Sequence, residues 1–155
     1  MRCAILTSII CLYGIGYLSG CANISKAKFP EPTANFQPNT TYDATYDQIW
    51  SSVMRVLERE RIGISSSDKD GGRIVTDYVQ GPTQLQALGL FGSITLRYNY
   101  AISLEKISQD KTKAAIICRL ESMSEKVTWH EVSKDNKAIV TKLENWLYEQ
   151  IEKSL

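Results

Sequence analysis

The chain contains a single histidine, His130. Its four cysteines show no metal-binding spacing. One imidazole with scattered carboxylates does not make a normal zinc site, and neither an H-x-x-x-H nor a C-x-x-C pattern occurs. No phosphate-binding glycine loop and no evident nucleophile and base are present. The sequence therefore predicts a protein that is not an enzyme and that holds no metal and no cofactor.

An excess of one charge is also lacking. Lysine and arginine total 18, aspartate and glutamate total 17, and the formal net charge is +1. Binding to nucleic acid through the phosphate backbone needs a basic surplus, so we expect no nucleic-acid partner. The 155 residues, of which 43% are hydrophobic and 23% charged, are typical of a chain with one globular domain.

The one long apolar run lies at the start of the chain. Arg2 supplies a positive charge, residues 3–18 are almost wholly apolar, and small residues follow. This order is typical of a secretory signal, which we place at residues 1–20. An uncleaved membrane anchor is the alternative, but the run is shorter than the roughly 20 residues that a spanning helix needs.

The end of this run, Leu18-Ser19-Gly20-Cys21, resembles the lipobox of bacterial lipoproteins. The resemblance implies that Cys21 becomes the first residue of the mature chain, with a diacylglycerol on its thiol and an acyl chain on its amino group. Two or more acyl chains give stable anchoring, so the membrane is one expected partner. Ala22 after the cysteine implies sorting to the outer membrane, with the domain facing the periplasm.

Residues 21–42 predict a lipidated cysteine followed by a flexible tether. Three of the four prolines lie here among asparagine, threonine and serine, and neither a helical nor a strand period is visible. Part of the segment, residues 35–42, can pair as an edge strand, although the prolines argue against a central one.

Residues 43–155 carry the pattern of an α+β domain. Apolar residues recur at helical spacing over 46–57 and 139–151, and they alternate with polar ones over 94–105 and 112–121. A strand over 73–80 places Ile74, Thr76 and Tyr78 on one face, and Glu149 falls on the charged face of the last helix. We expect one antiparallel sheet of about four to five strands with two helices on one face, and Cys118 as a buried hydrophobe.

The loop over residues 81–93, GPTQLQALGLFGS, is the most distinctive stretch of this domain. It places four large apolar side chains between glycines: Leu85, Leu88, Leu90 and Phe91. A connection of this length in a small domain is commonly a binding loop. These side chains either close one end of the core or contact a partner, a lipid or a ligand.

The order of the segments YDATYDQIW, DKDGGRIVTDYV, LRYNYAISL and VTKLENWLYEQI resembles a lipoprotein domain of the BamC (NlpB/DapX) type. The resemblance covers about residues 42–153 and implies a helix-grip-like fold. It also implies a non-enzymatic role, through protein contacts, in the machinery that assembles outer-membrane β-barrels.

Three functions follow as hypotheses. The first is a lipid-anchored interaction module that binds an envelope protein. The second is a carrier for a lipid or small apolar ligand held between helix and sheet. The third is an envelope enzyme, which the residue inventory disfavours.

Overall fold

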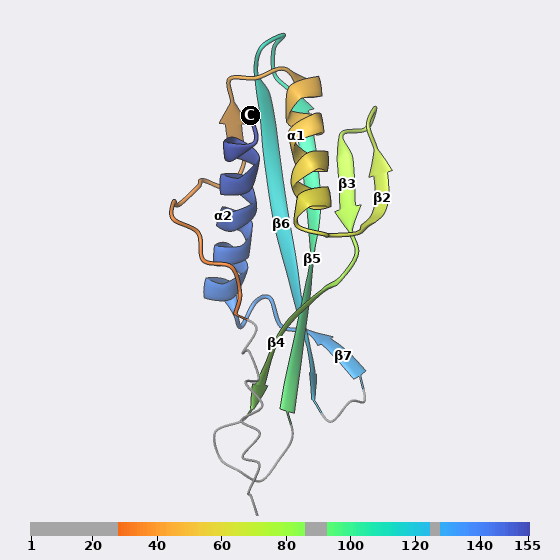
Figure 1. Cartoon of the computed structure of the whole chain (residues 1–155), viewed down its shortest axis with the longest axis vertical. Coiled ribbons are helices and arrows are strands. Elements are labelled where there is room, and N and C mark those ends of the chain that lie inside the picture. Colours follow the sequence, from red (N-terminus) through yellow and green to blue (C-terminus); the bar gives the residue numbers. More distant parts are fainter. Residues whose placement is uncertain (1–27, 86–92, 125–127) are drawn as a thin grey trace, which may run out of the picture.

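A long antiparallel hairpin forms the centre of the molecule, and two helices lie side by side on one of its faces (Figure 1). The computed structural model describes residues 28–85, 93–124 and 128–155. The elements in chain order are β1 (Thr40–Tyr42), α1 (Tyr46–Arg59), β2 (Ile64–Asp68), β3 (Arg73–Thr76), β4 (Val79–Leu85), β5 (Ser93–Lys106), β6 (Thr112–Ser124), β7 (Thr128–Glu131) and α2 (Lys137–Lys153).

The described strands form one seven-stranded sheet in which every pairing is antiparallel. The hairpin of β5 and β6 is its spine; toward the turn of this hairpin, β3 pairs with β5 and β1 pairs with β6, and β2 extends the sheet beyond β3. At the other end β4 pairs with β5 and β7 pairs with β6. The α+β class and the two helices on an antiparallel sheet are confirmed, but the prediction of four to five strands was wrong.

One additional strand arises where a single run of sequence divides between two neighbours. The expected strand over 73–80 is two strands, β3 and β4, with Asp77 and Tyr78 between them. Ile74 and Thr76 are buried as predicted, but after this break Tyr78 lies on the opposite face and is 38% exposed. β4 contains Gly81 and Pro82, which normally argue against a strand, and its pairing with β5 is irregular between Gln80 and Thr83.

The face of the sheet that meets the helices, here called the inner face, carries the core. The alternation over 94–105 is confirmed, because Leu96, Tyr98, Tyr100, Ile102 and Leu104 are all buried. From β6 the buried set is Ala114, Ile116, Cys118 and Leu120, as the sequence predicts. The other face, here called the outer face, is open: the side chain of Ile117 in β6 is 65% exposed.

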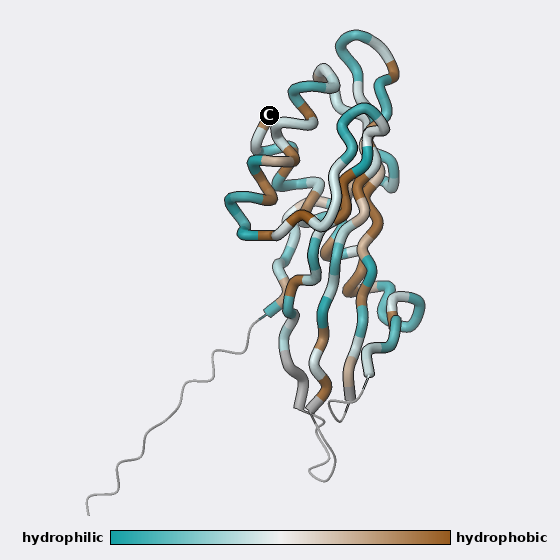
Figure 2. Tube along the Cα trace, turned by 90° about the vertical axis from the view of Figure 1, so that its right-hand side faces the viewer, coloured by the Kyte–Doolittle hydropathy of each residue, from teal (hydrophilic) through white to brown (hydrophobic). Residues whose placement is uncertain are grey.

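The two helices cover only part of this sheet, as the side view also shows (Figure 2). They lie over the half of the hairpin near its turn, here called the helix-covered end. We call the rest the helix-free end; it consists of β4, β7 and the segments that pair with them, residues 93–98 of β5 and 121–124 of β6.

Part of the segment for which the sequence predicts a flexible tether lies along α2. In residues 29–36, here called the strap, the backbone N–H and hydroxyl of Thr33 both donate to the carboxylate of Glu149. The backbone N–H of Phe36 donates to Asn145 Oδ1 at 3.1 Å. The ring of Phe36 stacks on Tyr148 with centroids 5.7 Å apart.

The prediction that Glu149 lies on an exposed, charged face of α2 was wrong. The sequence places it on the charged face of the helix, but the strap covers it and leaves it 4% exposed. Hydrogen bonds from Lys153 and Thr33 hold the pKa of Glu149 at about 2, below its ordinary value of 4.5. The strap is thus bound through a carboxylate that stays charged.

The edge of β6 between β1 and β7 pairs with side chains rather than with another strand. β1 pairs with β6 up to Ala114 and β7 begins to pair at Glu121. In the gap three backbone N–H groups, at alternate residues, donate to oxygens of side chains at 2.9 Å. The pairs are Ile116 with Tyr148, Cys118 with Glu144 and Leu120 with Ser133. α2 and the turn before it thus complete the bonding of this edge.

Candidate interaction surface

The residues that the sequence singles out for function lie mostly outside the described structure. Cys21 falls in residues 1–27, and Leu88, Leu90 and Phe91 fall in residues 86–92. For Leu85 only the backbone is described, which ends β4 opposite Ser93 of β5. The expected roles of these five residues therefore stay predictions.

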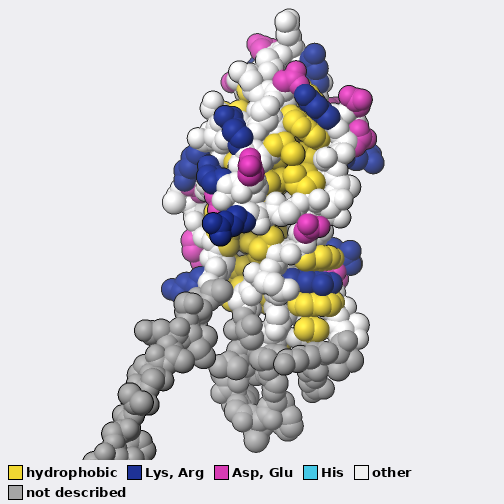
Figure 3. All heavy atoms as spheres, turned by 45° about the vertical axis from the view of Figure 1, so that its right-hand side comes forward, with side chains coloured by type: hydrophobic (Ala, Val, Ile, Leu, Met, Phe, Trp, Pro, Cys, Tyr) yellow, Lys and Arg dark blue, Asp and Glu magenta, His cyan; other side chains and the backbone are white. Residues whose placement is uncertain are grey.

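The described residues instead bring a compact polar and aromatic group together on the outer face of the helix-free end. The guanidinium carbon of Arg97 in β5 lies 4.0 Å from the ring centroid of Tyr78 and 4.0 Å from that of Trp129 in β7. Figure 3 shows hydrophobic and basic side chains stacked on this part of the surface. We call Tyr78, Arg97, Glu121 and Trp129 the Arg97 cluster.

Sheet register explains why these four side chains meet. Arg97 pairs directly with Glu121 across β5 and β6, and Trp129 of β7 pairs with Met123, two residues further along β6. Side chains of directly paired residues share a face of the sheet. Tyr78 joins them because the break between β3 and β4 turns it outward.

Glu121 is the carboxylate that ties the cluster together. It is only 5% exposed, and it accepts hydrogen bonds from Tyr78 Oη at 2.7 Å and Arg97 Nε at 2.8 Å. Burial opposes the charged form, but the hydrogen bonds from Tyr78 and Arg97 and the nearby positive charges hold the pKa of Glu121 below its ordinary value. The carboxylate is therefore ionised and Arg97 is held flat between the two rings.

The charges around this cluster neutralise one another. Arg119 Nε lies 3.3 Å from carboxylate oxygens of both Glu121 and Glu131, and Arg97 Nη2 lies 2.7 Å from Glu121. Cationic stacking on aromatic rings adds about 0.5–1 kcal/mol at exposed sites and more where water is excluded. The result is an amphipathic surface with paired charges.

The described residues offer little for metal chemistry or membrane spanning. Among them, no three histidine, cysteine or acidic side chains gather closely enough to hold a metal ion. Neither of the two described helices has the length and apolarity that a membrane span needs. His130 is exposed on β7 and belongs to no such group.

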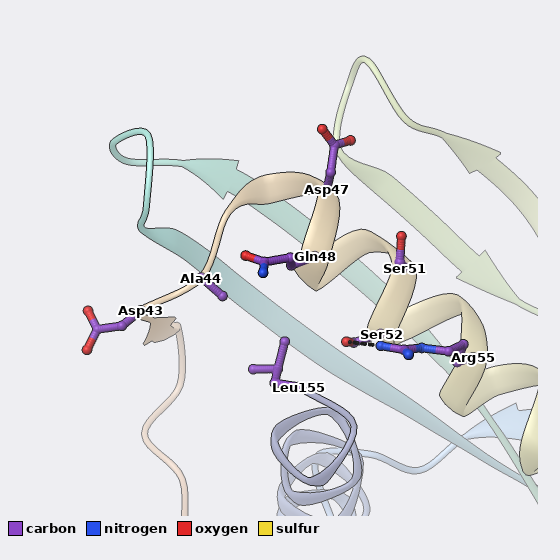
Figure 4. Close-up of a pocket in the computed structure, with 8 residues that line it drawn as sticks. All are labelled: Asp43, Ala44, Asp47, Gln48, Ser51, Ser52, Arg55 and Leu155. Atoms are coloured by element: carbon purple, nitrogen blue, oxygen red, sulfur yellow. Dashed lines mark hydrogen bonds between the residues drawn. The ribbon is translucent and has the colours of Figure 1, made fainter.

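A second feature is a shallow groove between the start of α1 and the C-terminal residue (Figure 4). Arg55 Nη2 donates to Ser52 Oγ at 3.0 Å and to the Ser154 carbonyl at 2.9 Å, and this links the two helices at its floor. Its lining is mainly polar and contains neither histidine nor cysteine: Asp43, Ala44, Asp47, Gln48, Ser51, Ser52, Arg55 and Leu155.

Sequence reasoning missed the Arg97 cluster, although one signal for it was available. The alternating runs over 94–105 and 112–121 leave both Arg97 and Glu121 on the face opposite the apolar residues, and the observed register pairs the two directly. Trp129 joins the cluster from a strand of only four residues, and Tyr78 joins it because the chain changes face between β3 and β4. Neither feature produces a hydrophobic repeat that can be recognised in the sequence.

Comparison with known proteins identifies a family and a distant structural likeness. A search of curated proteins finds no match. Among solved structures, a DUF4468 family protein from Bacteroides ovatus ATCC 8483 is similar over 84% of this chain and 85% of its own, with 13% sequence identity and a TM-score of 0.39. The model of the outer membrane protein assembly factor BamC-like N-terminal domain matches residues 33–154, from the strap to the end of α2. The chain therefore belongs to the BamC-like N-terminal domain family.

Proposed function

We propose that this protein is an outer-membrane-anchored lipoprotein that acts as a non-enzymatic interaction module of the cell envelope, accessory to the assembly of outer-membrane proteins. The family match over residues 33–154 is the observation that carries this proposal. Lipid on Cys21 supplies the anchor, and the domain faces the periplasm. The chain needs no cofactor and no metal for this role.

A filled helix–sheet interface favours the module over the ligand carrier. Leu143, Leu147 and Ile151 of α2 are fully buried against the sheet. The hydroxyl of Tyr100 donates to the Leu143 carbonyl at 3.2 Å, and that of Tyr148 accepts from the Ile116 N–H. A carrier needs space between these same elements, and opening it would break both contacts.

The protein partner is proposed to bind at the loop that joins β4 to β5. Clusters of exposed, large apolar side chains commonly mark sites of contact with another protein, and this loop carries large apolar side chains between glycines. The residues proposed for this contact are Leu85, Leu88, Leu90 and Phe91.

Two measurements test this function. Metabolic labelling with a fatty acid should label the wild-type chain, and Cys21→Ala should abolish both the label and membrane fractionation while the 43–155 domain stays folded. An unlabelled wild-type chain contradicts the lipoprotein assignment.

Crosslinking in intact envelopes tests the partner. We expect the wild type to capture an envelope protein and the double variant Leu88→Asp, Phe91→Asp to lose it. Circular dichroism of the variant serves as the control for folding. If every crosslinked partner persists in a folded double variant, the loop is not the binding site.

A further inference from the structure

The strap fixes the point at which the chain leaves the domain toward Cys21. The ring of Phe29 packs on Tyr98 of β5, with centroids 6.0 Å apart, on the inner face of the helix-free end. The contacts of Thr33 and Phe36 with α2 hold the following residues. The segment that leads back to Cys21 therefore starts at a defined place, beside the helix-free end and far from the turn of the β5–β6 hairpin.

This leading segment is short. Cys21 precedes Lys28 by seven positions, which span at most about 25 Å when fully extended. Residues 93–98 of β5 continue past the exit point for about 17 Å, at about 3.3 Å per residue. In the side view the described chain begins in the lower half of the molecule and the strands extend below it (Figure 2). A bilayer that holds Cys21 must therefore lie within reach of the helix-free end.

The outer face of that end has the chemistry of a membrane interface. Tryptophan and tyrosine prefer the headgroup region, where the ring is shielded and its polar atom stays wet. Trp129 and Tyr78 are both partly exposed, and Arg97 between them is ion-paired to Glu121. The pairing lets the guanidinium approach lipid without an uncompensated charge. Phe29 lies on the inner face beside Gly81 of β4, and the thickness of one sheet layer, about 10 Å, is within the length of the segment.

We propose that the helix-free end rests on the lipid headgroups of the anchoring membrane, with the Arg97 cluster as the contact. This inference rests on the proposed function, because it requires Cys21 to carry lipid. A segment of about seven residues keeps the end at a millimolar effective concentration, so a contact too weak to bind free protein suffices. Because the charges of the face are paired, the contact needs no anionic lipid and depends little on salt.

The test uses the full lipidated chain reconstituted in phosphatidylcholine vesicles that contain a brominated phosphatidylcholine. An environment-sensitive fluorophore is placed on Thr128→Cys, at the start of β7 in the helix-free end. The matched control carries it on Ser66→Cys in β2, which pairs with β3 at the helix-covered end. Both positions are exposed. Burial raises the pKa of the Cys118 thiol, so labelling is confined to the engineered cysteine.

We expect bromine quenching and a blue shift at position 128 and neither at position 66, unchanged between low and high salt. Insertion of about twenty glycine and serine residues between Ala22 and Lys28 lowers the effective concentration roughly eightfold and should reduce the quenching accordingly.

The outcomes separate the two proposals. A chain that does not float with the vesicles overturns the lipoprotein function itself. A chain that floats but leaves position 128 unquenched, or quenches both positions equally, overturns the headgroup contact alone and leaves the Arg97 cluster open to a protein partner.

Discussion

The two ends of the β5–β6 hairpin are built by different means. At the helix-covered end the inner face is buried under α1 and α2, and its outer face is bare enough to leave Ile117 65% exposed. At the helix-free end neither helix lies over the sheet, and the outer face carries stacked rings and ion pairs: Tyr78, Arg97, Glu121 and Trp129. One end obtains its order from apolar burial, and the other adds a polar and aromatic group on the opposite face.

This difference separates folding from recognition. Burial under the helices stabilises the chain, but it leaves few side chains free to contact anything else. The Arg97 cluster holds its side chains rigid while they remain at the surface, which lowers the entropy lost on binding. The helix-free end is therefore the part of the fold that combines order with accessibility.

The largest effect should come from the helix-covered end. Leu147→Ala removes a fully buried side chain between α2 and the sheet, and we expect a loss of about 2–5 kcal/mol in the free energy of unfolding. Ile117→Ala, on the outer face of the same region, should change it by no more than about 0.5 kcal/mol. Urea unfolding followed by circular dichroism measures both; similar losses in the two variants would contradict the division of the sheet into a buried and an open face.

A smaller effect should follow from breaking the helix-free end. Glu121→Gln leaves Arg97 stacked between two rings without its counter-charge, and we expect a loss of about 1–3 kcal/mol. Glu105→Gln is the matched control on β5, because its partner Lys113 is 3.7 Å away and the Glu105 side chain is 67% exposed. Its expected change is close to zero. Equal unfolding midpoints for the two variants would show that the cluster adds no order.

The smallest effect concerns the strap, which links the two ends. The pKa of Glu149 is about 2 in the folded chain and ordinarily 4.5, so the charged form is favoured by folding. Its contribution is complete above about pH 4.5 and is lost as the pH falls toward 2. The protection of the amides of Thr33 and Phe36 from hydrogen exchange, relative to the unfolded chain at the same pH, should therefore fall in acid.

Glu149→Gln should accelerate exchange at Thr33 already at neutral pH, whereas Glu152→Gln, on the exposed side of α2, should not. Protected amides in Glu149→Gln would mean that the strap is held by Phe36 and its stacking on Tyr148 rather than by the carboxylate.

Sequence patterns were sufficient for the elements with long apolar periods. The alternation over 94–105 predicted the inner face correctly, and the apolar stripes over 46–57 and 139–151 predicted both helices, because burial on one face imposes a repeat over many residues. The sequence also predicted Cys118 as buried. The inner face, the two helices and the burial of Cys118 each depend on a single helix or strand that turns one side toward the core.

The strand count, the strap and the Arg97 cluster were missed because each depends on contacts between distant segments. Glu149 reads as a surface charge until Thr33 covers it, more than a hundred positions earlier in the chain. Tyr78 changes face at a break that local alternation does not reveal. The burial and the face of such residues are determined by tertiary contacts, which neither secondary-structure propensity nor hydrophobic periodicity reports.

The hydrogen bonding along the edge of β6 bears on how this protein could aggregate. While α2 is in place, the N–H groups of Ile116, Cys118 and Leu120 are occupied by side-chain oxygens. If α2 and the turn before it detach, these three donors, at alternate residues of β6, become a template on which a foreign strand can add. Aggregation should therefore begin with the detachment of α2 and this turn, before the sheet itself unfolds, and the packing of α2 protects the open edge of β6.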